Sequence, residues 1–181
     1  MLNDTIAAIS TALQDGAISV IRISGPDSLA IAGRLFSRRV DDQPTHTVRY
    51  GYIIDPISKE AVDEVLLTVF RAPKTFTRED VVEISGHGGR YITRRILALV
   101  LAEGARLADP GEFTRRAFLN GRIDLTQAEA VMDMIDADSS QQAQLAIQGI
   151  RGSIRRLIEP LSEALLNIIA NIEVNIDYPE K

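Results

Sequence analysis

The stretch DPGEFTRRAFLNGRIDLTQAEAVMDMID, residues 109–136, decides the fold because it joins two different architectures. It predicts a helix opened by Pro110 and Gly111, a short polar break at Asn120-Gly121-Arg122, and a second helix beyond that break. The residues before it alternate between strand and helix spacing, whereas the residues after it show only helical spacing. We therefore predict an α+β chain, in which a mixed α/β region is followed by an all-α segment.

The second helix of this stretch has two overlapping candidates for its cap. Asp124 with Gln127, and Thr126 with Glu129, each place a side-chain oxygen three residues before a Gln or Glu. This is the spacing of a capping box, in which the two residues satisfy each other's backbone N–H groups. The sequence leaves both candidates open.

Composition excludes several classes of site before any motif is considered. The chain has 181 residues, of which 45% are hydrophobic, a formal net charge of −5 and no cysteine. A packed core is therefore expected, while the acidic balance argues against broad non-specific binding of nucleic acid. Without cysteine there is no disulfide, thiolate nucleophile or Cys-ligated zinc. No signal peptide and no apolar run of about 18 residues occurs, so we expect a soluble cytoplasmic protein with no membrane partner.

Runs of β-branched and apolar residues before the central stretch predict a sheet. We expect its strands at residues 5–10, 17–24, 48–54, 64–70, 81–85 and 105–108. Helices are expected to begin near Pro26 and after Gly89, since proline suits the first turn of a helix. The strand at 64–70 is almost continuously apolar, a pattern typical of a strand that is covered on both faces.

Two charged residues interrupt these strands. Alternation places Ile21 and Ile23 on one face of their strand and Arg22 on the other, and it places Glu83 opposite its apolar neighbours. An arginine in the middle of a short strand is usually solvated, so the pattern alone assigns Arg22 no function.

A glycine-rich turn, Gly86-His87-Gly88-Gly89, links one of these strands to a helix. Such a turn can bind an anion, because the first N–H groups of a helix have no partner within it. Glycines also serve tight turns, so both interpretations stay open. His87 has no second histidine or carboxylate at metal-ligand spacing, and we expect no metal site there. A general base and a hydrogen bond within the turn are its two candidate roles.

The residues after the central stretch predict a helix at 139–150 and then an apolar stripe from Ile154 to Ile176. Pro160 interrupts the stripe, so we expect a kink or a new start of the helix there. Burial of each such side chain stabilises a protein by about 1.5–3 kcal/mol. Because so large a stripe would not be left exposed, we expect either a second copy of the chain or the rest of a longer protein to cover it. No GxxxxGK[ST] motif occurs, so we expect no nucleoside triphosphate hydrolysis by this segment alone.

Several stretches together resemble the MnmE (TrmE) family of tRNA-modification GTPases. They are DTIAAIST at 4–11, IRISGPD at 21–27, EDVVEISGHGG at 79–89, PGEFTRRAFLNGRIDLTQAEA at 110–130 and IDYPE at 176–180. The resemblance implies that residues 1–119 form a dimerising α/β domain that binds 5-formyl- or methylene-tetrahydrofolate. It also implies that residues 120–181 are the first part of a helical domain, and that the family's GTPase domain is absent from this chain.

The resemblance further implies the reaction and its partners. In the family, a homodimer works with an FAD-containing partner, MnmG (GidA), on the wobble uridine of certain tRNAs. Together they add an aminomethyl or carboxymethylaminomethyl group at C5, with the carbon taken from methylene-tetrahydrofolate. GTP hydrolysis, assisted by potassium and magnesium, drives the conformational cycle. The alternatives are a stand-alone folate-binding module and a structural dimerisation fragment without catalytic activity.

Three folate contacts of the family fall on matching positions here: Arg22, Glu83 and Arg122. A carboxylate such as Glu83 can accept paired N–H groups from a pterin ring, and an arginine suits the carboxylates of the folate tail. Which arginine meets which group stays open. Many members carry lysine at the position of Arg122, and the two side chains are not fully equivalent. We expect no catalytic residue and no metal site in this segment.

Two pairs of neighbouring arginines, Arg94-Arg95 and Arg115-Arg116, are expected on solvated helix faces rather than on a tRNA-binding surface. A departure from the family lies at residues 11–16, TALQDG, where many members carry a Pro-Pro or glycine-rich turn. This departure affects the shape of the first loop and the expected rim of the pocket.

Overall fold

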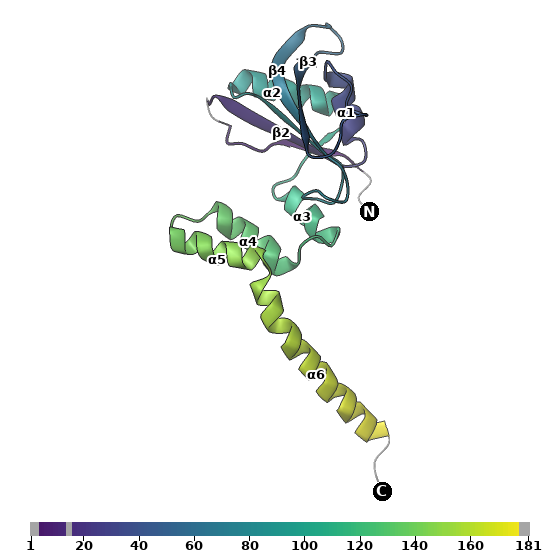
Figure 1. The fold of residues 1–181 in the computed structure, drawn as a ribbon, viewed down its shortest axis with the longest axis vertical. Coiled ribbons are helices and arrows are strands. Elements are labelled where there is room, and N and C mark those ends of the chain that lie inside the picture. Colours follow the sequence, from purple (N-terminus) through teal and green to yellow (C-terminus); the bar gives the residue numbers. More distant parts are fainter. Residues whose placement is uncertain (1–3, 14–15, 178–181) are drawn as a thin grey trace. The chain divides into compact units, whose positions relative to one another are not determined.

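The structure is a computed structural model that describes residues 4–13 and 16–177 (Figure 1). Gln14 and Asp15 of the first loop, and the residues after Asp177, lie outside the described residues. Internal contacts divide the chain into two compact units, Met1–Arg122 and Ile123–Lys181. The first contains a six-stranded sheet with helices, and the described part of the second contains helices alone, so the predicted α+β class is confirmed.

The sheet has the strand order β3-β4-β5-β2-β1-β6. Its strands are β1 (Ile6–Ile9), β2 (Ile18–Ser24), β3 (Thr47–Ile54), β4 (Ala61–Phe70), β5 (Val81–His87) and β6 (Arg106–Leu107). Neighbouring strands are antiparallel except β1 and β6, which are parallel. This order brings β2 and β5, which are far apart in the sequence, together in the middle of the sheet.

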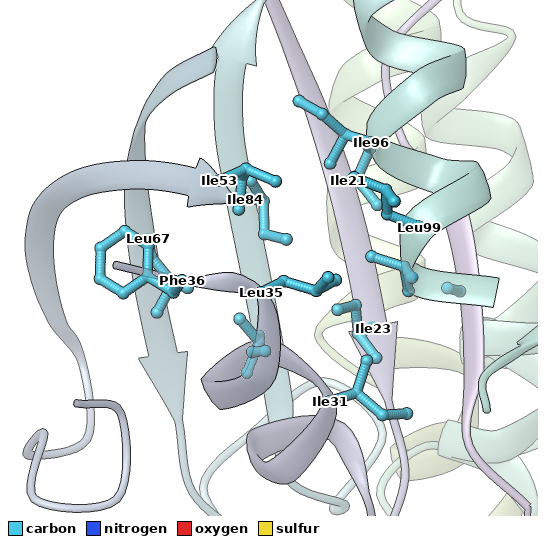
Figure 2. Close-up of a cluster of buried hydrophobic side chains, with 14 of the residues drawn as sticks. Ile21, Ile23, Ile31, Leu35, Phe36, Ile53, Leu67, Ile84, Ile96 and Leu99 are labelled. Atoms are coloured by element: carbon cyan, nitrogen blue, oxygen red, sulfur yellow. The ribbon is translucent and has the colours of Figure 1, made fainter. Parts of the chain in front are cut away.

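Two helices, α1 (Ser28–Leu35) and α2 (Arg90–Ala102), cover one face of the sheet. Ile21 and Ile23 lie on the covered face, as the alternation predicts, and each is at most 1% exposed. Figure 2 shows the core that these elements share. Its labelled members are Ile21, Ile23, Ile31, Leu35, Phe36, Ile53, Leu67, Ile84, Ile96 and Leu99.

On the opposite face of the sheet, several apolar side chains stay exposed among the described residues, and one expectation about this face is wrong. Val65, Leu67 and Val69 of β4 are buried, but Leu66 between them is 48% exposed. The continuous apolar run of β4 therefore does not mean that both faces are covered, because α1 and α2 share one buried cluster on one side. We call the exposed apolar residues of the other side the open sheet face: Ile18, Val48, Tyr50, Tyr52 and Leu66.

The central stretch forms two helices, as predicted. The first, α3 (Glu112–Leu119), begins after Gly111, whose φ of 72° lies in the left-handed region that glycine adopts without strain. The second, α4 (Leu125–Ile135), is capped by Asp124, whose side chain accepts a hydrogen bond from the backbone of Gln127 while the Gln127 side chain accepts one from Asp124 N–H. The structure thus selects the first of the two candidate capping boxes.

The helical unit continues with α5 (Ser140–Ile150) and α6 (Ser153–Asp177). In the contact of α4 with α5, Gly149 lies so close to Ala130 that a Cβ on it would come within 2.6 Å of the Ala130 Cβ. The helix α6 runs unbroken through Pro160, so the expected new start is wrong. Its apolar stripe is half or more exposed along its described length, for example at Leu161 and Leu165. No helix among the described residues is long and apolar enough to cross a membrane.

Candidate functional site

Arg22 and Glu83 form an ion pair on the face of the sheet opposite α1 and α2. They are direct cross-strand partners on β2 and β5. Nε of Arg22 donates to Oε1 of Glu83 at 2.9 Å, and Nη2 lies 2.7 Å from the same oxygen. The side chains are 29% and 26% exposed. Arg22 is therefore held in place rather than freely solvated, and within the described residues Oε2 of Glu83 accepts no hydrogen bond.

Two aromatic rings flank this ion pair. The Cζ atom of Arg22 lies 5.5 Å from the ring centroid of Phe113 on α3 and 6.0 Å from that of Phe76 in the connection at 72–80. These separations allow cation–π attraction, which is worth about 0.5–1 kcal/mol at exposed sites. Sequence reasoning missed both rings, since Phe113 reads only as an apolar helix position and Phe76 lies in a turn-rich connection without a motif.

Arg122 reaches the same region through Phe76. Its Cζ atom lies 4.9 Å from the centroid of that ring, so Phe76 contacts one guanidinium from β2 and another from the end of α3. The structure thus brings the three sequence-predicted residues together: Arg22 and Glu83 directly, and Arg122 through a shared aromatic neighbour. Their function as folate contacts stays a prediction.

A second group of charges surrounds a buried arginine of α3, and it corrects the expectation that Arg116 is solvated. Arg116 is 0% exposed. Its Nη2 donates to Oδ1 of Asp4 at 2.7 Å, and its Nη1 donates to Oε1 of Glu79 at 3.1 Å. Glu112, also buried, accepts from Nη2 at 3.2 Å. Burying a charge is unfavourable unless it is paired, and here three carboxylates compensate one guanidinium.

The other three arginines of the two predicted pairs lie at the surface. Arg115, next to Arg116, has a side chain that is 55% exposed. Arg94 is exposed on α2, and Arg95 is partly exposed while it pairs with Asp55. Burial therefore separates two arginines that are adjacent in the sequence.

This buried cluster holds the segment that carries Phe76. Oε2 of Glu79 accepts from Ser24 Oγ at 2.7 Å, which ties the segment to the end of β2. Nδ2 of Asn120, the residue that ends α3, donates to the backbone oxygen of Thr77 at 2.6 Å. These hydrogen bonds connect the segment of Phe76 to the end of β2 and to the end of α3.

Packing requires a glycine at one position of the glycine-rich turn, while anion binding by the turn stays a prediction. A Cβ on Gly88 would lie 2.5 Å from the backbone oxygen of Gly16, so a larger residue does not fit there. His87 is hydrogen-bonded outside the turn: its Nδ1 lies 2.6 Å from Oδ1 of Asp63, and its N–H donates to Oδ2 at 2.8 Å. The hydrogen bond to Asp63 raises the pKa of His87 above its ordinary value. Within residues 4–13 and 16–177, no three His, Cys, Asp or Glu residues gather to hold a metal.

Comparison with known proteins gives two family matches and a set of similar relatives. Residues 5–122 match the family described as the GTP-binding protein TrmE N-terminus, and residues 125–181 match the MnmE helical domain. The tRNA modification GTPase MnmE of Geobacillus kaustophilus is 56% identical over 181 residues, and that of Lactobacillus delbrueckii subsp. bulgaricus is 54% identical over 178 residues. Each alignment covers 98% of this chain and 39% of the relative.

Proposed function

Since this chain belongs to the MnmE (TrmE) family, we propose that it is the folate-binding and dimerising portion of a GTP-dependent tRNA-modifying enzyme. In this proposal the α/β unit binds 5-formyl- or methylene-tetrahydrofolate. The whole protein, with the FAD-containing MnmG partner, adds an aminomethyl or carboxymethylaminomethyl group at C5 of the wobble uridine. The chain spans about two fifths of the length of its relatives and contains no P-loop motif, so GTP, potassium and magnesium are assigned to other parts of the protein.

The arrangement of Arg22, Glu83 and Arg122 around Phe76 carries this proposal. A folate presents N–H donors on its pterin ring at one end, an aromatic ring in the middle and carboxylates at the other end. The site presents these partners in a matching set: an accepting carboxylate, an aromatic side chain and a guanidinium. Charge-assisted hydrogen bonds at both ends fix the orientation of such a ligand.

Calorimetric titration with 5-formyltetrahydrofolate tests the proposal. We expect saturable binding of one folate per chain, and no heat with glutarate, a dicarboxylate of similar charge that lacks both rings. An absence of heat with the folate at high micromolar concentration would remove the folate-binding function and leave the structural alternative.

The open sheet face supports the dimer, and we propose that a second copy of the chain covers it. Leu66 lies at its centre, directly opposite Tyr50 on β3 and Ser85 on β5. Its 48% exposure leaves an apolar side chain in water, which pairing with another copy would relieve.

We expect Leu66→Asp to convert the dimer into a monomer in light scattering, because a carboxylate in an apolar interface loses its hydration without a partner. Ile57→Asp is the matched control: Ile57 is 92% exposed in the turn between β3 and β4, so the same change there should leave the dimer intact. A monomeric wild type contradicts the dimer, and a dimeric Leu66→Asp protein assigns the contact to another surface.

A further inference from the structure

A basic hollow lies beside the proposed folate site. It has a volume of about 450 Å³ and contains Phe76 and Arg122 among its lining residues. His46, Lys74 and Arg78 also line it, and none of its lining residues in the described chain is acidic. We call this hollow the tail pocket.

The cations of the tail pocket lack the carboxylate partners that at least half of the arginines in the same unit have. Arginines with such partners are Arg22, Arg34, Arg49, Arg95, Arg106, Arg115 and Arg116. Within the described residues, Lys74 and Arg122 form no ion pair, and the Arg78 side chain donates only to the backbone oxygen of Asn120. A chain with a net charge of −5 thus keeps several unneutralised cations at one place. Like charges gathered without counter-charges repel one another, and an anionic ligand relieves that repulsion.

The backbone at the pocket shows a second unusual feature. His46 and Arg78 have φ angles of 59° and 58°, in the left-handed region that residues with a side chain rarely adopt. Such conformations are unfavourable for them and cluster at ligand sites. The Arg78 side chain also donates a hydrogen bond to the backbone oxygen of Asn120. This bond fixes the position of the Arg78 guanidinium at the pocket.

We propose that the tail pocket binds the glutamate carboxylates of the folate tail and favours folates that carry several glutamates. This inference rests on the proposed folate-binding function and makes it specific. Arg22 is already neutralised by Glu83, so this pair faces the pterin end of the ligand. Phe76 packs against the benzoyl ring in the middle. Arg122, with Lys74 and Arg78, binds the carboxylates. In this assignment Arg22 therefore meets the pterin end of the folate and Arg122 meets its tail.

Titration of the purified protein with 5-formyltetrahydrofolate carrying one or five glutamates tests this assignment. We expect the wild type to bind the pentaglutamate roughly 10-fold more tightly, because each added carboxylate can meet an unpaired cation. In the Lys74→Gln/Arg78→Gln double variant, this ratio should fall to about 1–2. Lys59→Gln is the matched control: Lys59 is an exposed cation in the turn between β3 and β4 and should preserve the ratio.

The outcomes distinguish a failure of the tail pocket from a failure of folate binding itself. A ratio near 1 in the wild type, or an unchanged ratio in the double variant, overturns the tail pocket while folate binding stands. No heat with either ligand removes both proposals together. If a short single-stranded RNA competes away the gain from the longer tail but leaves binding of the monoglutamate unchanged, the cations belong to a nucleic-acid surface and the inference is overturned.

Discussion

Arg22→Ala is expected to weaken the binding of 5-formyltetrahydrofolate by about 10–100-fold, because a hydrogen bond to a charged group is worth about 1.5–3 kcal/mol. In this structure the loss has two sources. The ligand loses contact with the guanidinium, and Glu83 loses the partner that holds Oε1 and leaves Oε2 free to accept. Calorimetric titration of the variant against the wild type measures the change directly.

The control for this prediction is Arg34→Ala. Arg34 also pairs with a glutamate, Glu103, but it lies on α1 and contacts none of the site residues, so its loss should leave the affinity unchanged. A double-mutant cycle with Glu83→Ala adds a stricter criterion. Residues that act on one ligand as a pair lose less in combination than the sum of their single losses. An unchanged affinity in Arg22→Ala would exclude Arg22 from the folate site.

Local pattern was enough to predict which face each strand residue occupies. Alternation along β2 separated Arg22 from Ile21 and Ile23, and the structure confirms that separation. The spacing of glutamate and arginine residues does not reveal that β2 and β5 are neighbours. That neighbourhood depends on the strand order β4-β5-β2-β1, which side-chain packing across the whole sheet decides. The family resemblance, rather than periodicity, predicted that Arg22 and Glu83 belong to one site.

The errors share a physical cause, which is that burial is decided by distant segments. Leu66 lies in an apolar run, yet its side chain is 48% exposed among the described residues. Arg116 lies beside an exposed arginine on a short helix, yet it is buried because Asp4, 112 residues earlier, reaches it. The i,i+4 spacing of Glu112 and Arg116 allows their pairing, but it does not reveal that both side chains are buried. Phe76 was missed for the same reason, since its importance comes from the two guanidiniums that meet at its ring.

Arg116→Met is expected to destabilise the α/β unit by about 3–5 kcal/mol, because removal of one partner leaves buried charges uncompensated. Methionine fills much of the same volume, so the loss measures the charge more than a cavity. Glu79 loses its charged donor, whereas Asp4 and Glu112 lose one of their cations and keep Arg106. Urea unfolding of the variant, followed by circular dichroism, gives the free energy of unfolding.

Arg115→Met is the matched control, since its side chain is 55% exposed and the same change there should cost no more than about 0.5 kcal/mol. The acid dependence gives a further test. The hydrogen bond from Arg106 lowers the pKa of Glu112 to about 2, whereas the unfolded chain has the ordinary value of 4.5. The stabilisation by this carboxylate is therefore complete above the ordinary pKa and is lost as the pH falls from there toward 2. Arg116→Met weakens the pairing that favours ionised Glu112, so the decline in stability should begin at the same ordinary pKa, be smaller, and end at a higher pH than in the wild type. Equal stability losses in the two arginine variants would mean that the buried cluster does not hold α3 and the Phe76 segment together.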